Sequence, residues 1–187
     1  ESMVETSFGS TTITVSPDMD TGLTLKYSNP KEIGSDRIVN AAAAYEKFHR
    51  DLIIVDFGTA TTFCAVNRDG EYLGGVIAPG LTISAEALFT RAAKLSKVEL
   101  ARPKTVIGTD TASSIQSGLI FGYAGLVDTL VQRMEREMGR TSYVIATGGL
   151  ASVIAPEARS IQHLEPFLTL HGLDLLYRRA RGASLTQ

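Results

Sequence analysis

The sequence predicts a protein of the α/β class. Three short apolar or β-branched segments follow one another with turns between them, which is typical of an antiparallel meander; they are residues 52–55, 61–66 and 72–77. Two segments with helical spacing of apolar residues come next, at residues 84–94 and 113–138. Because strands and helices are mixed along the chain, we expect a sheet flanked by helices.

Weaker patterns predict the remaining elements. Residues 7–15 are rich in β-branched side chains, and residues 144–146 form a short apolar run that ends in a glycine pair. The expected elements are a strand or connector at 7–15, an extended piece at 22–27, a helix at 36–48, a strand at 144–146, a short helix after residue 151 and a helix at 168–180.

Composition argues against some classes of function. The 187 residues include 18 basic and 20 acidic side chains, a net charge of -2, whereas a nucleic-acid-binding protein normally has a basic excess. The single cysteine, Cys64, cannot form an internal disulfide and suits a reducing compartment. His49, His163 and His171 lack the spacing of metal ligands, which argues against a zinc site.

The sequence shows neither a signal peptide nor a membrane span. The segment Glu1 to Met3 resembles a cleavage remnant, and no basic segment followed by an apolar one comes after it. In the expected long helix, the longest run without charged or amide side chains is Ser117–Val127, far shorter than the roughly 20 residues that span a bilayer. We therefore expect a cytoplasmic protein without a membrane partner.

The clearest local motif lies between two expected strands, where residues 56–62 are Asp-Phe-Gly-Thr-Ala-Thr-Thr. Phosphate binding needs backbone N–H groups and hydroxyls that converge on an anion; glycine allows the close approach and threonine supplies donors. Asp56, at the strand end, can hold a cation that offsets phosphate charge. The alternative is a tight hairpin in which Asp56 caps the turn.

A second glycine turn follows the strand at residues 144–146, with the sequence Thr147-Gly148-Gly149. A Gly-Gly turn that opens a helix can admit a flat ligand such as adenine against the backbone, and helix N-termini favour anions. The alternative is a plain strand-to-helix turn that needs a positive φ angle.

An acidic turn at residues 27–37 gathers many polar side chains. Asp36 stands where a helix begins, so it either caps that helix or accepts a proton from a substrate hydroxyl during phosphoryl transfer. Glu32 and Arg37 either form a surface ion pair or belong to the same site.

The long helix carries small residues four apart, at Ser114, Gly118 and Gly122. Such a stripe lets another backbone approach, so this helix either belongs to the core or forms a dimer interface. Just before it, residues 109–111 either cap the helix or offer the Thr111 hydroxyl to a ligand.

Taken together, these motifs resemble those of type III pantothenate kinases, over residues 22–177. The resemblance is carried by residues 29–37, 56–62, 74–80, 108–111 with 116–118, and 146–151. It implies an actin/RNase H-like fold of the ASKHA superfamily (the actin, sugar-kinase and Hsp70 class). In this scheme residues 1–49 are the remaining part of a first domain with the pantothenate loop, and residues 50–187 are a complete second domain with the phosphate and adenosine loops and the interface helix.

The resemblance also implies a reaction. The family phosphorylates pantothenate in the first step of coenzyme A synthesis, with ATP, Mg²⁺ and a monovalent cation, K⁺ or NH₄⁺, and it is homodimeric. By resemblance, the catalytic proton acceptor is Asp36 and the monovalent-cation ligand is Asp56. The implied pantothenate contacts are Tyr27, Gly34, Ser35, Arg37 and Thr111, and the implied ATP contacts are Gly58, Thr59, Gly148 and Gly149.

The sequence departs from the family pattern in two ways. Cys64, Ser96 and His171 stand where the family usually has aspartate, proline and glutamate. The family's first Asp-x-Gly-Asn-Thr segment is absent, so we expect an N-terminally truncated chain that is inactive by itself. Alternatives are a non-catalytic relative that regulates transcription, and another actin-like ATPase or sugar kinase; residues 29–37 disfavour the latter.

Overall fold

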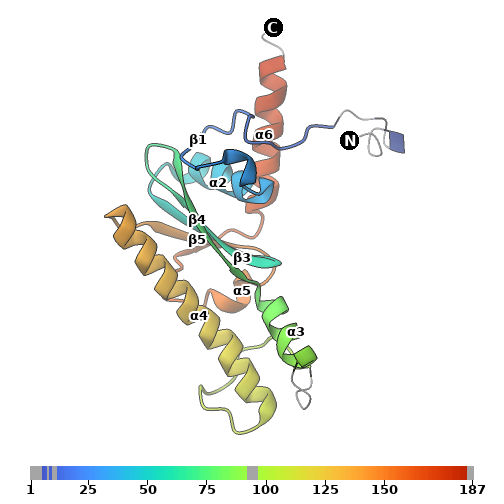
Figure 1. The fold of residues 1–187 in the computed structure, drawn as a ribbon, viewed down its shortest axis with the longest axis vertical. Coiled ribbons are helices and arrows are strands. Elements are labelled where there is room, and N and C mark those ends of the chain that lie inside the picture. Colours follow the sequence, from blue (N-terminus) through green and yellow to red (C-terminus); the bar gives the residue numbers. More distant parts are fainter. Residues whose placement is uncertain (1–5, 8, 10–11, 92–96, 185–187) are drawn as a thin grey trace.

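A six-stranded mixed sheet organises the chain, with helices on both of its faces (Figure 1). The computed structural model describes residues 6–7, 9, 12–91 and 97–184. The strands are β1 (Thr24–Leu25), β2 (Leu52–Phe57), β3 (Ala60–Val66), β4 (Glu71–Pro79), β5 (Tyr143–Thr147) and β6 (His163–Leu164). The helices are η1 (Pro30–Glu32), α2 (Ser35–Phe48), α3 (Leu81–Arg91), α4 (Thr111–Met138), α5 (Ala151–Ile154) and α6 (Leu168–Ser184).

The strand order is β1-β4-β3-β2-β5-β6. The strands β2, β3 and β4 form the antiparallel meander that the sequence predicts. On the other side of β2, β5 pairs with it in parallel, and β6 pairs in parallel with β5. A meander followed by parallel strands beside its first strand is the arrangement of the actin/RNase H-like fold, so the expected α/β class is confirmed.

Most expected elements are present, with small differences at their edges. Residues 12–16 form a connector, which is one of the two alternatives expected for residues 7–15, and the extended piece at 22–27 shortens to β1, which pairs in parallel with β4. The strand β6 was not predicted, because two residues are too few to show a period. The expected helix at 84–94 is α3, which begins at Leu81; residues 92–94 and Ser96 lie outside the described residues.

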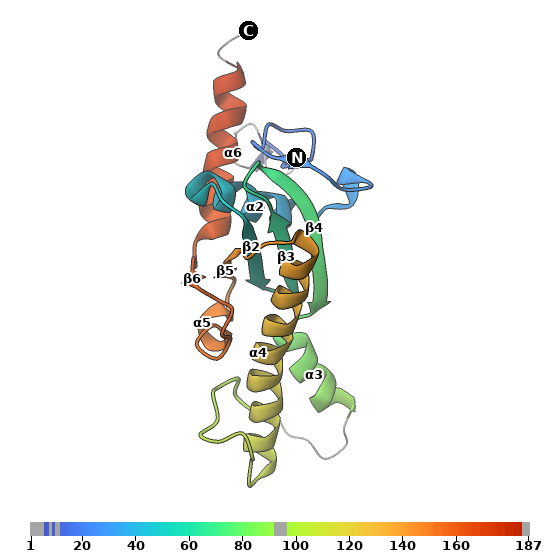
Figure 2. The same ribbon diagram turned by 90° about the vertical axis from the view of Figure 1, so that its left-hand side faces the viewer.

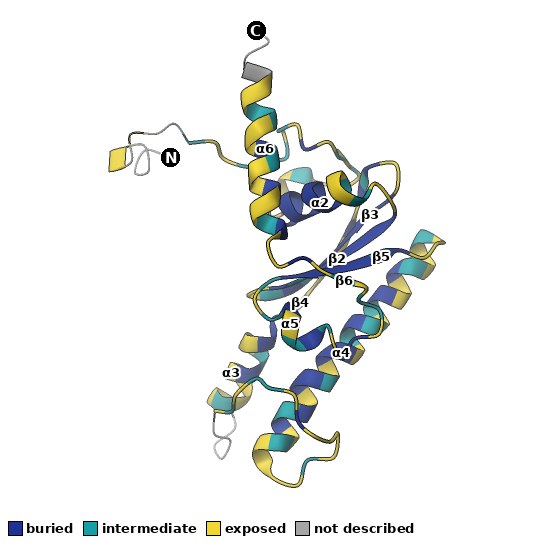
Figure 3. Ribbon diagram, turned by 180° about the vertical axis from the view of Figure 1, so that it is seen from behind, coloured by how far each residue is buried: buried dark blue, intermediate teal, exposed yellow. Residues whose placement is uncertain are grey.

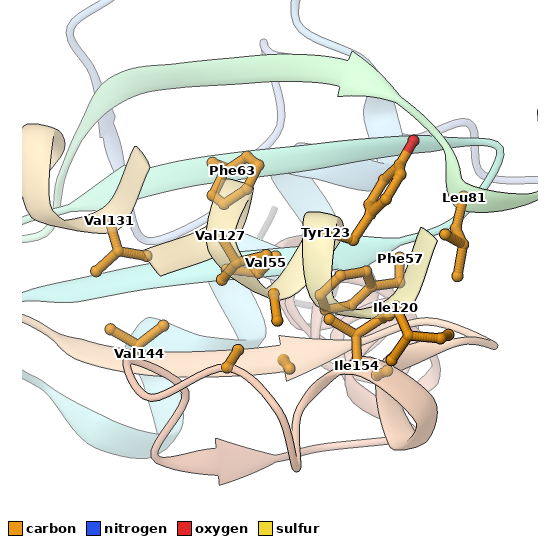
Figure 4. Close-up of a cluster of buried hydrophobic side chains, with 14 of the residues drawn as sticks. Val55, Phe57, Phe63, Leu81, Ile120, Tyr123, Val127, Val131, Val144 and Ile154 are labelled. Atoms are coloured by element: carbon orange, nitrogen blue, oxygen red, sulfur yellow. The ribbon is translucent and has the colours of Figure 1, made fainter. Parts of the chain in front are cut away.

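Alternation along the strands separates two cores. Val55, Phe57 and Phe63 point to one face, where they pack with α4 side chains such as Ile120 and Val127 (Figure 4). Their strand neighbours Ile54 and Cys64 point to the opposite face, where α2 covers them. The central strands are buried from both sides, as Figure 3 shows in dark blue, which explains why β2 is an uninterrupted apolar run up to Asp56.

The helix α4 is long and apolar enough to cross a membrane when judged by length and composition alone. In this structure 44% of its apolar window is buried, and its Leu119 and Tyr123 side chains pack in the core. The small residues lie on another face of the helix: no atom lies within 4 Å of a Cβ added at Gly118 or Gly122. One face of the helix therefore packs in the core, and another face exposes the stripe of small residues.

Asp51 anchors the start of β2. Its carboxylate accepts hydrogen bonds from the backbone N and Nε of Arg68, both at 3.0 Å, and from Arg140 Nη1 at 3.3 Å. These bonds tie the β3–β4 turn and the segment before β5 to the central strand. Burial alone would raise the pKa of Asp51, but the hydrogen bonds and charge of Arg68, aided by Arg140, outweigh it and lower the pKa.

A lowered pKa has a defined effect on stability. The contribution of Asp51 is present above the pKa it has in the unfolded chain and is lost as the pH falls through its folded-state pKa. We predict that Asp51→Asn lowers the free energy of unfolding by about 1–3 kcal/mol at pH 7. The difference should shrink at about pH 3, below the ordinary aspartate pKa. Urea unfolding at both pH values measures this, with the exposed Asp69→Asn as control. A penalty of equal size at both pH values would contradict the assignment.

Candidate functional site

The carboxyl ends of β2 and β5 bring the two glycine turns together. Asp56 pairs across the sheet with Thr62 of β3 and with Thr147 of β5. The turn after β2 is a tight hairpin, in which the Gly58 backbone N donates to the Ala60 carbonyl at 3.1 Å. The two loops expected to contact ATP are therefore neighbours at one end of the sheet, and the hairpin geometry of the first is confirmed.

Gly148 has to be glycine at this point. Its φ angle is 93°, and an added Cβ would collide with Asp56 Oδ1 and lie 2.7 Å from the backbone N of Phe57. The second glycine, Gly149, has no neighbour near an added Cβ. The two glycines thus differ in their surroundings. The Gly148 backbone is in close contact with the Asp56 carboxylate, whereas Gly149 is exposed to solvent.

The Asp56 carboxylate is half-buried and held from one side. Its Oδ2 accepts a hydrogen bond from Asn40 Nδ2 at 2.9 Å. Burial, and secondly the negative charge of Asp36, raise the pKa of Asp56 above its ordinary value, while the bond from Asn40 opposes the rise. The negative charge of Asp36 therefore reaches Asp56, so the start of α2 lies within electrostatic range of the phosphate loop.

Asp36 lies in the first turn of α2 but is not the N-cap, which is Gly34. The exposed Asp36 carboxylate accepts a hydrogen bond from the backbone N of Arg37 through Oδ1, at 2.8 Å. An added Cβ on Gly34 would lie 2.6 Å from the same oxygen. Gly34 therefore makes room for the carboxylate, and Ser35 beside it is exposed at the start of the helix.

Arg37 is buried, so the alternative of a surface ion pair with Glu32 is wrong. The Arg37 side chain is 5% exposed, its Nε donates to Cys64 Sγ at 3.4 Å, and its guanidinium lies 5.9 Å from the centre of the Tyr72 ring. Within the described part of the chain, Arg37 Nη2 has no hydrogen-bond partner.

The orphaned nitrogen of Arg37 lies beside the sheet edge. An added Cβ on Gly75 of β4 would lie 2.9 Å from Arg37 Nη2, and the Tyr27 ring lies next to Gly74. A buried cation without an anionic partner is costly, because desolvation is not offset by pairing. The position is therefore suited to an anionic group of a ligand.

Thr111 is not brought to these residues within one chain. It is the first residue of α4, directly after the N-cap Asp110, and α4 carries it to the opposite end of the molecule from α2 (Figure 1, Figure 2). There it lines an open cavity of about 590 Å³ together with Leu88 and Gly108. Gly34, Asp36 and Arg37 thus lie together at the start of α2, whereas Thr111 lies at the far end of α4 (Figure 1).

The side chains near Asp56 limit which ions could bind there. No three His, Cys, Asp or Glu side chains in the described ranges gather in a group that could bind a metal ion. Asp56 instead offers a single carboxylate, with Oδ1 against the Gly148 backbone. Carboxylate oxygen is the ligand that hard cations prefer, so Asp56 can contribute a ligand to a cation.

Two contacts of this site were missed from the sequence. Asn40 contacts Asp56, and Cys64 contacts Arg37. A signal for Asn40 was available: it is a polar residue in a stretch of α2 that is otherwise isoleucine, valine and alanine from Ile38 to Ala44, and buried amides are nearly always hydrogen-bonded. Cys64 gave no such signal, because a buried free cysteine behaves as a small apolar residue.

The two adjacent glycines allow a matched test. We predict that Gly148→Ala lowers the free energy of unfolding by about 1–3 kcal/mol, because the new methyl group meets Asp56 and the φ angle is strained. Gly149→Ala, which meets nothing, should stay close to the unmodified chain. Urea unfolding of the three proteins decides this, and equal effects of both substitutions would refute the described contact.

Known proteins resemble this chain in sequence. A family model described as type III pantothenate kinase matches residues 1–133. The type III pantothenate kinase of Syntrophus aciditrophicus is 56% identical over 179 residues, which cover 96% of this chain and 70% of that protein. The type III pantothenate kinase of Geobacter sulfurreducens is 56% identical over 174 residues, which cover 93% of this chain and 68% of that protein.

A solved structure has the same fold. It is a conserved protein of Campylobacter jejuni, assigned by its description to the Baf family of transcriptional activators, with a TM-score of 0.60 and 17% identity. The match covers 86% of this chain and 69% of that one. At this identity the likeness concerns the fold alone. The matching family model and the two relatives that are 56% identical show that the chain belongs to the type III pantothenate kinase family.

Proposed function

We propose that the full-length protein transfers a phosphoryl group from ATP to pantothenate, forming 4'-phosphopantothenate in the first step of coenzyme A synthesis. One observation supports this most directly: the charge of Asp36 reaches Asp56, which stands where the glycine turns after β2 and β5 meet. Phosphoryl transfer depends on positioning and on neutralising phosphate charge, and this end of the sheet has groups for both tasks.

Asp36 is the proposed proton acceptor. Its carboxylate is exposed, and the bond from the Arg37 backbone N fixes the orientation of Oδ1. A carboxylate held in this way can receive the proton of a substrate hydroxyl while that oxygen attacks the phosphoryl group. The first turn of α2 also favours negative charge, which suits a carboxylate at this position.

The pantothenate site is proposed around Arg37. The substrate carries a carboxylate, and the unpaired Nη2 of a buried guanidinium is a fitting donor for it. The Tyr27 ring lies next to Gly74 and would line the same space, with Gly34 and Ser35 at its rim. Binding the anion would offset the cost of burying Arg37 without a partner.

The ATP contacts are proposed at the two turns. Gly58 and Thr59 are exposed in the hairpin after β2, where backbone N–H groups and the threonine hydroxyl can face phosphate oxygens. Gly148 and Gly149 are proposed on the adenosine side. Asp56 would hold K⁺ or NH₄⁺, and Mg²⁺ would accompany ATP; when bound, these cations supply charge that offsets the phosphates.

A homodimer is part of the proposal. Thr111 is exposed and far from Asp36 in its own chain, so a pantothenate contact from Thr111 requires a second copy. The outward stripe of Gly118 and Gly122 on α4 gives another backbone room to approach. We further propose a cytoplasmic enzyme without nucleic-acid or membrane partners, which suits the free thiol of Cys64 and the net charge of -2.

A transcriptional regulator is the less favoured alternative. The relatives that are 56% identical are named as kinases, whereas the Baf family likeness is at 17% identity. Asp36 and Asp56 are also present and close enough to influence each other, which a regulator would not need.

The role of Asp36 can be tested by removing its charge. We predict that Asp36→Asn in the full-length protein lowers kcat by about 10²–10⁴-fold, because asparagine cannot accept the proton, while pantothenate binding remains measurable. Single-turnover assays and calorimetric titration measure the two quantities. The exposed Asp18→Asn, remote from the site, is the control. A near-normal rate in Asp36→Asn would rule out its role as base.

The role of Asp56 predicts a requirement for a monovalent cation. Turnover by the full-length protein should need K⁺ or NH₄⁺ and should stay low when choline replaces them at equal ionic strength. Asp56→Asn should remove this dependence together with most of the activity, since the amide has no charge to balance the ion. Equal rates in potassium and in choline would sink the assignment of Asp56.

A further inference from the structure

Two polar side chains outside the proposed catalytic set connect Asp56 to the C-terminal helix. Asn40 on α2 donates from Nδ2 to Asp56 Oδ2 at 2.9 Å, and Thr169 on α6 donates from Oγ1 to Asn40 Oδ1 at 2.7 Å. Asn40 is 2% exposed, so water cannot replace either partner easily. A continuous chain of hydrogen bonds thus runs from α6 through α2 to the end of β2.

Each member of this chain fixes the orientation of the next. An ionised carboxylate only accepts, so the Asn40 amide must turn its nitrogen to Asp56 and its oxygen to Thr169. The Thr169 hydroxyl then has its hydrogen directed at that oxygen. Since Asp56 Oδ2 is taken by Asn40, Oδ1 is the oxygen that faces the Gly148 turn.

The contact between α2 and α6 is close at this level because of a glycine. Gly172 lies one turn after Thr169, and an added Cβ there would collide with the Val39 carbonyl and lie 2.6 Å from Val39 Cγ1. Glycine inside a helix costs about 1 kcal/mol relative to alanine. Its presence is explained by the backbone contact with Val39, the residue before Asn40, which brings Thr169 within hydrogen-bonding distance.

We propose that Asn40 and Thr169 are positioning residues that present Asp56 Oδ1 to the monovalent cation. The close contact between α6 and α2 at Gly172 keeps Thr169 within hydrogen-bonding distance of Asn40. The positioning role rests on the cation role proposed for Asp56. Groups behind a metal ligand orient it, and their loss weakens ion binding without touching the reacting atoms. The C-terminal helix thereby influences the cation site although none of its residues reaches it.

The experiment compares Thr169→Val, which keeps the shape and removes the hydroxyl, with Thr169→Ser, which keeps the hydroxyl. In the full-length protein, the K⁺ concentration for half-maximal thermal stabilisation is measured at constant ionic strength with choline. We expect Thr169→Val to raise it by about tenfold and Thr169→Ser to match the wild type. The K⁺ concentration for half-maximal activation should rise in parallel, with kcat at saturating K⁺ close to wild type.

Two further variants address the other members. Gly172→Ala, which pushes α6 away from Val39, should raise the K⁺ requirement as Thr169→Val does, whereas Gly182→Ala, farther along the same helix where nothing lies near an added Cβ, should not. Asn40→Ala should raise the K⁺ requirement the most. If that variant fails to fold, the comparison of Thr169→Val with Thr169→Ser still tests the proposal.

Three outcomes would overturn the proposal. One is an unchanged K⁺ requirement in Thr169→Val while the wild type depends on K⁺. Another is an equal rise in the valine and serine variants, which would indicate packing rather than the hydroxyl. A wild type that neither needs K⁺ nor is stabilised by it would remove the cation role of Asp56 itself, and the wild-type protein alone reveals that failure.

Discussion

The site depends on the double pairing of β2. This strand is antiparallel to β3 on one side and parallel to β5 on the other, with continuous register along both. A strand paired in this way must have the hairpin to β3 and the turn after β5 at the same end. Asp56 occupies that end, opposite Thr62 and Thr147, so the register alone determines which loops can share a ligand. A slip of one residue would turn Asp56 into the α4 core.

The two faces of the sheet have different tasks. The α4 face is packed with apolar side chains and stabilises the fold, while the α2 face combines an apolar core with a polar end. At that end Arg37 is buried against Cys64 and Tyr72 without a carboxylate, and Asp56 is half-buried beside Asp36. Both groups carry charge that the described contacts do not balance. A substrate anion at Arg37 and a cation at Asp56 would balance these charges. Ligand binding would then offset the free energy lost by burying the two charged side chains.

Much of the fold could be predicted because its signals are local. The meander, α2 and the long α4 follow from apolar runs, turn residues and helical spacing, and the structure confirms them. The Asp56 loop and the glycine turn could be identified from the residue types that phosphate binding needs. Their proximity could not, because it follows from the parallel pairing of β2 with β5 across more than 80 intervening residues.

Other features of the site lay beyond the sequence for physical reasons. The burial of Arg37 depends on how the start of α2 meets β3 and β4, so the local pattern could not decide between a surface ion pair and a place in the site. The bond from Thr169 to Asn40 joins positions 129 residues apart and depends on the close contact at Gly172. The position of Thr111 at the far end of α4 became clear only once the helix was placed on the sheet.

The central claim is that Asp56 and the Gly148 turn form a monovalent-cation site at the carboxyl end of β2. The most direct measurement is a crystal structure of the full-length protein soaked in Tl⁺, a heavy substitute for K⁺ that anomalous scattering locates. The account predicts a Tl⁺ peak in contact with Asp56 Oδ1 and next to the Gly148 backbone, which is lost in Asp56→Asn. Peaks only at other positions, or one that persists unchanged in Asp56→Asn, would contradict it.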